Sequence, residues 1–120
     1  MKRPPCAGVF NPKTQTFDPL IMARTPEGKV KDKCVEIIQA YGGYYFFPLS
    51  NGMGRAGIPD VIVCYKGKFL GIECKAGFNK TTALQERELA AIQKAGGSAM
   101  VVREDTLEFL KDWFDRTRGE

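Results

Sequence analysis

Hydrophobic positions along the chain follow two periods, one typical of helices and one typical of strands. Before residue 42, apolar residues recur every three or four positions, at Val30, Cys34, Ile37, Ile38 and Tyr41. This spacing predicts an amphipathic helix. Thr25 is its expected N-cap, Pro26 its first residue, and Gly42-Gly43 its end. Glu27 lies on the same inward stripe, where a carboxylate is unexpected.

Four shorter segments are rich in β-branched and aromatic residues, which favour strands. The predicted strands cover residues 44–49, 60–65, 68–75 and 98–103. We expect the aromatic residues of the first strand to belong to the core. Lys66-Gly67 is the expected two-residue turn of a hairpin between the second and third strands.

Two more helices follow from their capping signals. Thr82 and Gln85 have the spacing of a capping box and open a helix that ends at Gly96-Gly97. Asp105 is expected to cap a last helix, whose apolar residues are Leu107, Leu110, Trp113 and Phe114. Residues 1–24 carry several prolines and no periodicity, and we interpret them as an extended arm. The prediction is a single α/β domain over residues 25–120, with helices flanking a mixed central sheet in the order α-β-β-β-α-β-α.

Composition narrows the chemistry that this domain can perform. The formal charge of +4 is compatible with a polyanionic partner. The absence of histidine excludes Ser-His-Asp and Cys-His mechanisms. Without histidine, and with no Cys-x-x-Cys pair among the four cysteines, a zinc site is not expected. No leader or membrane span is apparent, so we expect a soluble protein in the cytoplasm of a bacterial cell or virus-infected host.

The predicted hairpin brings three charged residues together. If Lys66-Gly67 is the turn, paired residues have numbers that sum to 133, and Asp60 faces Glu73. Directly opposed side chains have Cβ atoms about 4.5–5.5 Å apart, so the two carboxylates repel each other unless a cation lies between them. Lys75 lies on the same face because side chains alternate along a strand. Carboxylates suit Mg²⁺ or Mn²⁺, and the carbonyl of Cys74 points to the same region.

These residues carry a family resemblance. Gly57-Ile58-Pro59-Asp60, followed by Glu73-Cys74-Lys75 and then Gln85 on the next helix, resembles the PD-(D/E)XK nucleases. Within that superfamily the chain is similar to the VRR-Nuc (virus-type replication-repair nuclease) domain, from Glu27 to about Arg103. The resemblance implies that Asp60 and Glu73 bind the metal, that Lys75 is catalytic, that Gln85 lines the site and that Glu27 helps to hold the metal. Cys74 stands where an aliphatic residue is more common.

The resemblance also implies a substrate and an assembly. Stand-alone members are similar to Holliday-junction resolvases and act as homodimers on branched DNA. Arg55 and Gly57, in a glycine-rich loop before Asp60, and Lys80 are candidate DNA contacts. Candidate dimer contacts are Val9, Phe10, Phe17, Leu20, Ile21, Trp113 and Phe114.

Other interpretations of the same residues are kept beside this one. On spacing alone, Glu73 and Lys75 could form an exposed cross-strand ion pair. An acid such as Glu27 is favoured in any first helical turn by the helix dipole. A DNA-binding module without cleavage activity is the first alternative function, and a protein-interaction domain is the second. A metal-dependent nicking assay distinguishes the three.

Overall fold

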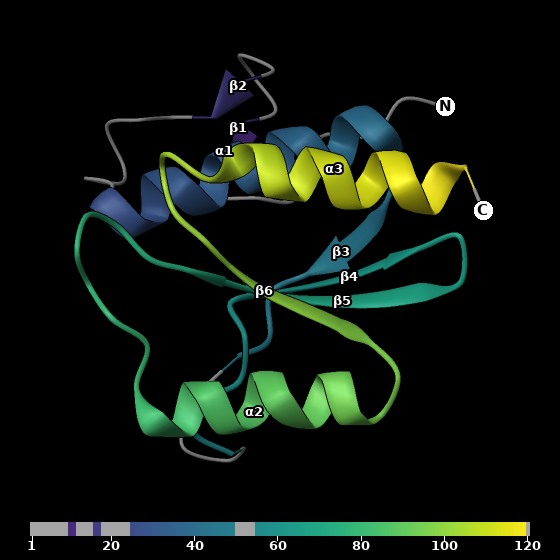
Figure 1. The fold of residues 1–120 in the computed structure, drawn as a ribbon. Coiled ribbons are helices and arrows are strands. Elements are labelled where there is room, and N and C mark those ends of the chain that lie inside the picture. The colour runs from purple at the N-terminus through teal and green to yellow at the C-terminus, as the bar shows by residue number, and fades with distance from the viewer. Residues whose placement is uncertain (1–9, 12–15, 18–24, 50–54, 120) are drawn as a thin grey trace.

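A four-stranded sheet lies between two helical layers in the computed structural model (Figure 1). The structure describes residues 10–11, 16–17, 25–49 and 55–119. In chain order the elements are β1 (Phe10–Asn11), β2 (Thr16–Phe17), α1 (Pro26–Tyr41), β3 (Tyr44–Phe46), β4 (Val61–Tyr65), β5 (Lys68–Cys74), α2 (Ala83–Lys94), β6 (Ser98–Val102) and α3 (Leu107–Arg118). In the predicted arm, β1 and β2 form a separate antiparallel pair. Val9, Leu20 and Ile21 lie outside the described residues.

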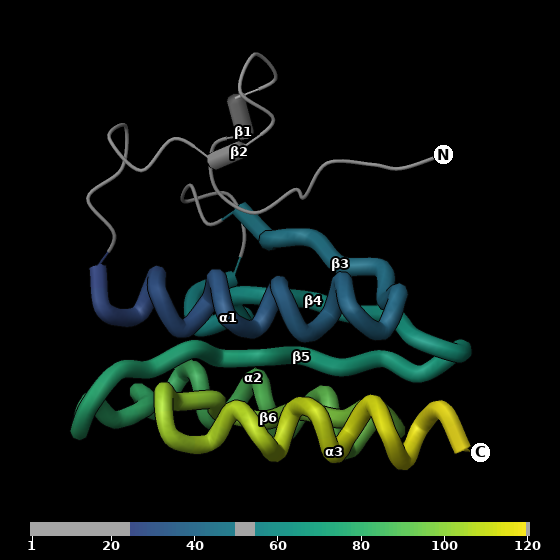
Figure 2. The backbone as a smooth tube through the Cα atoms, turned by 90° about the horizontal axis from the view of Figure 1, so that it is seen from above, coloured from purple at the N-terminus to yellow at the C-terminus, as the bar shows by residue number. Residues whose placement is uncertain are grey.

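The sheet has the order β3-β4-β5-β6 and is mixed, as the sequence predicts. Its first three strands are antiparallel, and β5 and β6 are parallel. Helices α1 and α3 cover one face and lie side by side, whereas α2 covers the other face (Figures 1 and 2). Strand β3 ends at Phe46, earlier than predicted. Pro48 has no N–H to donate to a ladder, which accounts for the shorter strand.

The hairpin register confirms the pairing that the sequence predicts. Tyr65 pairs with Lys68 across the Lys66-Gly67 turn, and the ladder continues without a bulge to Val61 and Ile72. One step further along the same register, Asp60 stands opposite Glu73. The two carboxylates are therefore brought together by the regular hairpin itself.

The face of the sheet beneath α1 and α3 is the hydrophobic core. Its fully buried side chains include Val61, Val63, Leu70, Ile72 and Cys74 from the strands, together with Cys34 and Ile38 from α1. Trp113 and Phe114 of α3 also belong to this core, where their rings pack edge to face. The expectation that these two residues form a dimer contact is therefore wrong, because their side chains are already buried within the chain.

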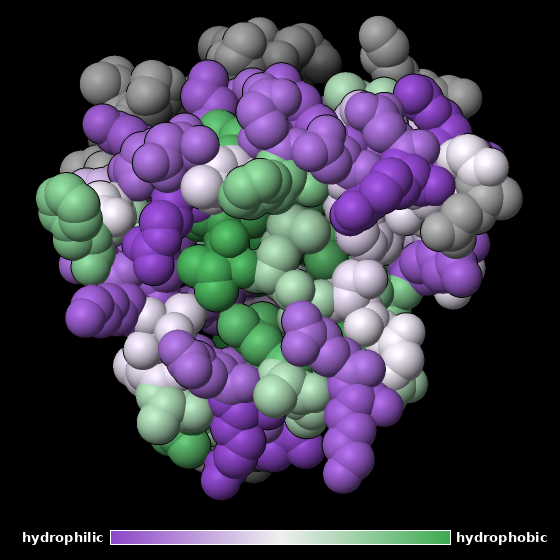
Figure 3. Space-filling model, viewed as in Figure 1, coloured by the Kyte–Doolittle hydropathy of each residue, from purple (hydrophilic) through white to green (hydrophobic). Residues whose placement is uncertain are grey.

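The opposite face is covered only in part, because α2 packs on β5 and β6. Tyr44 and Phe46 of β3 are 67% and 47% exposed, so the prediction that they belong to the core is wrong. Cys64 is exposed on the same half of the sheet, although it lies in a strand of mostly apolar residues. At the other side of the sheet, β6 contributes apolar surface between α3 and α2 (Figure 3).

The N-caps of α1 and α2 are the residues that the sequence predicts, whereas the N-cap of α3 differs. The hydroxyl of Thr25 accepts a hydrogen bond from the Gly28 N–H, and Thr82 forms the capping box with Gln85. The last helix has Thr106 as its N-cap in place of the predicted Asp105. The Thr106 hydroxyl accepts a hydrogen bond from the Arg103 N–H instead, which closes the corner between β6 and α3.

Candidate active site

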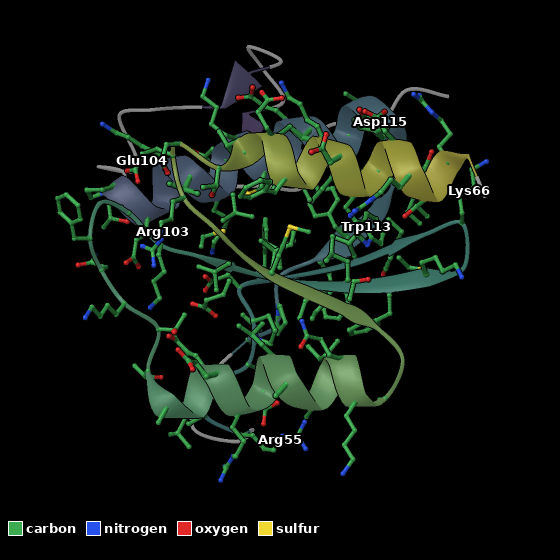
Figure 4. All side chains as sticks on the ribbon, viewed as in Figure 1. Arg55, Lys66, Arg103, Glu104, Trp113 and Asp115 are labelled. Atoms are coloured by element: carbon green, nitrogen blue, oxygen red, sulfur yellow. The ribbon has the colours of Figure 1, made fainter. Side chains whose placement is uncertain are left out.

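The candidate site lies at the end of the sheet opposite the Lys66-Gly67 turn. Four segments meet there: the beginning of α1, the residue before β4, the end of β5 and the beginning of α2. Figure 4 labels Lys66 at one end of the sheet, and Arg103 and Glu104 at the other. All five catalytic or metal-binding side chains predicted from the sequence come from these four segments.

Asp60 and Glu73 form the centre of the site. Asp60 accepts a hydrogen bond from the Cys74 N–H through Oδ2, at 2.8 Å. Glu73 is only 3% exposed, and its Oε1 atom is buried with no hydrogen-bond partner among the residues that the structure describes. A buried carboxylate oxygen without a partner costs free energy, because it has lost its water. Such an atom is available to a ligand that supplies positive charge.

Gln85 and Lys75 contact the other oxygen of Glu73. The Gln85 Nε2 donates to Glu73 Oε2 at 3.0 Å, and the Lys75 Nζ lies 3.9 Å from the same oxygen. The Gln85 Oε1 accepts from the Thr82 N–H at 2.9 Å. The capping box therefore fixes which end of the Gln85 amide faces the carboxylate, so one side chain serves both the helix end and the site.

The environment raises the pKa of Glu73 to about 8. Burial is the largest cause, because it removes the water that stabilises the charged form. The nearby Asp60 carboxylate raises the pKa further through its charge and as an acceptor for the Glu73 proton. Lys75 acts in the opposite direction and favours the ionised form. Without a cation, the site holds one of its two central carboxyls in the neutral form at pH 7.

Glu27 approaches the site from the other side of the sheet, in the first turn of α1. Its Oε2 accepts a hydrogen bond from the Asn79 Nδ2 at 3.0 Å. Asn79 is held by Arg103, whose Nη1 donates to the Asn79 carbonyl at 2.6 Å. The sequence analysis missed both residues, because no period or motif links a loop asparagine to an arginine at the end of a strand.

The three candidate DNA contacts lie in different environments. Arg55 has a 78% exposed side chain and forms an ion pair of 3.2 Å with Glu88, a buried residue of α2 that the sequence analysis did not single out. Gly57 has φ of +85°, and a Cβ there would lie 2.6 Å from the Leu84 carbonyl carbon. The fold itself therefore requires this glycine at the contact with α2. Lys80 is exposed in the loop before α2.

The donor set fits a hard divalent cation. Asp60 and Glu73 supply carboxylate oxygens, which Mg²⁺ and Mn²⁺ prefer, and the unpartnered Oε1 of Glu73 needs positive charge. The backbone N–H of Cys74 points to Asp60. In an extended strand the carbonyl of a residue leaves the same edge as its N–H, so the Cys74 carbonyl is directed to this side as well. Among the described residues, no group of three Asp, Glu or Cys side chains converges as a metal cluster, and Glu27 is hydrogen-bonded to Asn79.

Comparison with known proteins bears on the fold and the kind of protein. No protein-family model and no curated protein sequence matches the chain. A solved structure described as a VRR_NUC domain is similar to it, with a TM-score of 0.61 and 25% sequence identity. The match covers 77% of this chain and 97% of that one. In residues 25–49 and 55–119, no helix is long and apolar enough to cross a membrane. The fold thus confirms the resemblance that the motifs predict: the chain is a nuclease-type domain with the VRR-Nuc fold.

Proposed function

We propose that this chain is a metal-dependent DNA endonuclease that hydrolyses phosphodiester bonds at the Asp60–Glu73 site. The observation that carries the proposal is the burial of Glu73 beside Asp60, with one of its oxygens lacking a hydrogen-bond partner among the described residues. Ionising both carboxyls in this position destabilises the metal-free protein, and a bound cation relieves the repulsion. A purely structural ion pair would satisfy its own oxygens and would need no ligand.

Asp60, Glu73 and the Cys74 carbonyl are the proposed ligands of Mg²⁺ or Mn²⁺. The bound ion would polarise a phosphoryl oxygen and lower the pKa of a water molecule. The backbone helps to orient this site, because the Cys74 N–H donates a hydrogen bond of 2.8 Å to Asp60. Glu27, at the edge of the site and hydrogen-bonded to Asn79, would act through water as an outer ligand.

Lys75 is the proposed catalytic cation. Its side chain is 10% exposed and lies 3.9 Å from Glu73, so it remains in the site and does not extend into solvent. An ammonium group in this place stabilises negative charge that develops on the phosphate in the transition state. Gln85 is a positioning residue, since its amide holds Glu73 at 3.0 Å and is itself fixed by the helix cap.

DNA is the proposed partner, and branched DNA such as a Holliday junction is the proposed substrate. Lys80 and Arg55 would contact phosphates, and the loop around Gly57 would allow the DNA backbone to approach. Arg55 would then exchange its ion pair with Glu88 for a phosphate. Cutting two strands of a junction symmetrically requires two sites, which a two-fold homodimer supplies.

The test is a plasmid-nicking assay with the wild type and two conservative variants. We expect cleavage with Mg²⁺ or Mn²⁺ and none with excess EDTA. Asp60→Asn, which keeps an acceptor for the Cys74 N–H, should lose cleavage but keep the fold. Lys75→Met should reduce the rate and leave DNA affinity in EDTA largely unchanged. DNA binding without cleavage under all metals would favour the DNA-binding module, and neither binding nor cleavage would favour the interaction domain.

A further inference from the structure

A single aromatic side chain stands fully in solvent beside the candidate site. Phe78, in the loop between β5 and α2, is 99% exposed, the largest value among the exposed large hydrophobic residues of the described chain. Its neighbour Asn79 hydrogen-bonds Glu27, and Lys75 lies three residues earlier. A phenylalanine in such a place loses apolar stabilisation that it would gain anywhere in the core. Its position next to the candidate site makes Phe78 a candidate contact for a ligand of that site.

The turn that carries Phe78 is held firmly. The Asn79 N–H donates to the Ala76 carbonyl at 3.1 Å, which closes a β-turn with Gly77 and Phe78 at its centre. Gly77 has φ of +57°, a conformation that favours glycine at the first central position. Ala76, at the base of the turn, is buried. The ring is thus presented by a closed turn with an anchored base.

Two residues from the corner between β6 and α3 clamp this turn from outside. The Glu104 Oε1 accepts from the Gly77 N–H at 2.8 Å. The Arg103 Nη1 donates to the carbonyls of Gly77 and Asn79, at 3.4 and 2.6 Å. Figure 4 shows both labelled residues at the end of the sheet that holds the site. These hydrogen bonds use backbone groups of Gly77 and Asn79, on both sides of Phe78, and leave the Phe78 ring exposed.

We propose that Phe78 is a wedge that stacks on a base at the branch point of the DNA substrate, where the continuous base stack is interrupted. Apolar side chains inserted at a base step unstack and kink DNA, and a base presents a π-face to an aromatic ring whatever its sequence. Lys80, two residues away and exposed, supplies charge for the adjoining phosphate. A linear duplex keeps a continuous base stack at the cleavage point, which the wedge would first have to open, so the wedge favours branched DNA. This inference rests on the proposed nuclease function and adds the feature of the substrate that is recognised.

A side chain that acts as a wedge must be held in place by a rigid turn, whereas an exposed residue without a function need not be. Ordering a flexible loop on DNA would consume much of the free energy gained by stacking. The hydrogen bonds to Gly77 and Asn79 remove that cost before DNA arrives. They also tie the position of the ring to Glu27 through Asn79, so a base held by Phe78 has a fixed relation to the carboxylates.

The experiment compares a four-way junction with a linear duplex of the same sequence. Binding is measured in EDTA by fluorescence anisotropy, and cleavage is measured in Mg²⁺. Phe78→Ala should weaken binding to the junction by about tenfold and binding to the duplex by less than twofold. Phe78→Trp should restore the preference, because it keeps an aromatic face. Tyr44→Ala is the matched control, since Tyr44 is 67% exposed but pairs with Cys64 near the far end of the sheet.

The outcomes separate this inference from the function on which it rests. If the wild type cleaves DNA and Phe78→Ala keeps the same preference, or loses equally on both DNAs, the wedge is overturned and the nuclease stands. The wedge is also overturned if Tyr44→Ala reproduces the selective loss. A wild type that binds neither DNA overturns both.

Discussion

The two faces of strands β4 and β5 have opposite characters, although they are made by alternate residues of the same hairpin. On the α1 and α3 side, Val61, Leu70 and Ile72 are fully buried among apolar neighbours. On the α2 side stand Asp60, Glu73 and Lys75, of which the last two are buried as well. Burial alone therefore does not distinguish the core from the site. What distinguishes them is whether the buried polar atoms have hydrogen-bond partners.

Each face gains its stability in a different way. The apolar face is stabilised by the removal of hydrocarbon from water, which requires only close packing. Burial of the polar face costs free energy. Part of this cost is offset by hydrogen bonds, such as those from Gln85 to Glu73 and from Cys74 to Asp60. One oxygen of Glu73 has no hydrogen-bond partner in the part of the chain that the structure describes. A buried polar atom without a hydrogen-bond partner is typical of a place where a ligand binds.

The largest difference in cleavage rate is expected between substitutions at the adjacent residues 72 and 73. Glu73→Gln should lower metal-dependent cleavage by at least about 100-fold, because an amide is a poor ligand and lacks the charge to hold a cation. Ile72→Val, on the opposite face, should keep cleavage within about twofold of wild type. Initial rates of plasmid nicking at equal protein concentration measure both. Similar losses in the two variants would contradict the division of the faces.

The converse effect is expected for thermodynamic stability. Ile72→Ala removes a fully buried side chain and should lower the free energy of unfolding by about 2–5 kcal/mol. Cleavage per folded molecule should be unchanged, since Ile72 points away from the site. Urea denaturation followed by circular dichroism gives the first quantity, and rates normalised to the folded fraction give the second. A variant that is stable but inactive would contradict this prediction.

The polar face should also make the metal-free protein sensitive to pH. Glu73 has a pKa of about 8 in the folded protein and an ordinary value near 4.5 in the unfolded chain. Between these values the folded state binds more protons, so the free energy of unfolding falls as the pH rises. In EDTA, Glu73→Gln should remove this part of the dependence and stabilise the protein at pH 9 by on the order of 1–3 kcal/mol. Equal stabilities of the two proteins at about pH 4 and below, where Glu73 is protonated in both the folded and the unfolded state, provide the control.

The smallest effect is expected at the helix cap that joins fold and site. Thr82→Ala removes the acceptor for the Gln85 N–H and should cost about 1 kcal/mol. The N–H of residue 82 still donates to the Gln85 Oε1, but the first turn of α2 that carries Gln85 is loosened, so cleavage should fall by up to a few-fold at saturating DNA. Thr82→Ser, which keeps the hydroxyl, should restore both quantities. Thermal melting and single-turnover rates are the measurements, and full activity in Thr82→Ala would show that Gln85 holds Glu73 without the cap.

Much of this arrangement could be predicted because it depends on residues that are near one another in sequence. The turn at Lys66-Gly67 sets the register, and the register sets Asp60 opposite Glu73. The capping box of α2 is encoded by Thr82 and Gln85 within one helical turn. Predictions that depended on cover from distant elements were less successful: Tyr44 and Phe46 lie on a strand with an apolar pattern, yet α2 packs on β5 and β6 and leaves both side chains exposed.

By itself, the sequence determined the helices and strands of residues 25–120, the hairpin register and the three charged residues on one face. Periodicity, caps and turns are local, and local rules suffice for them. Only the tertiary structure decided how Glu27 reaches the site through Asn79, how Arg103 and Glu104 clamp the turn of Phe78, and that Trp113 and Phe114 are core. Such contacts join residues tens of positions apart, and their geometry exists only when the helical layers have packed on the sheet.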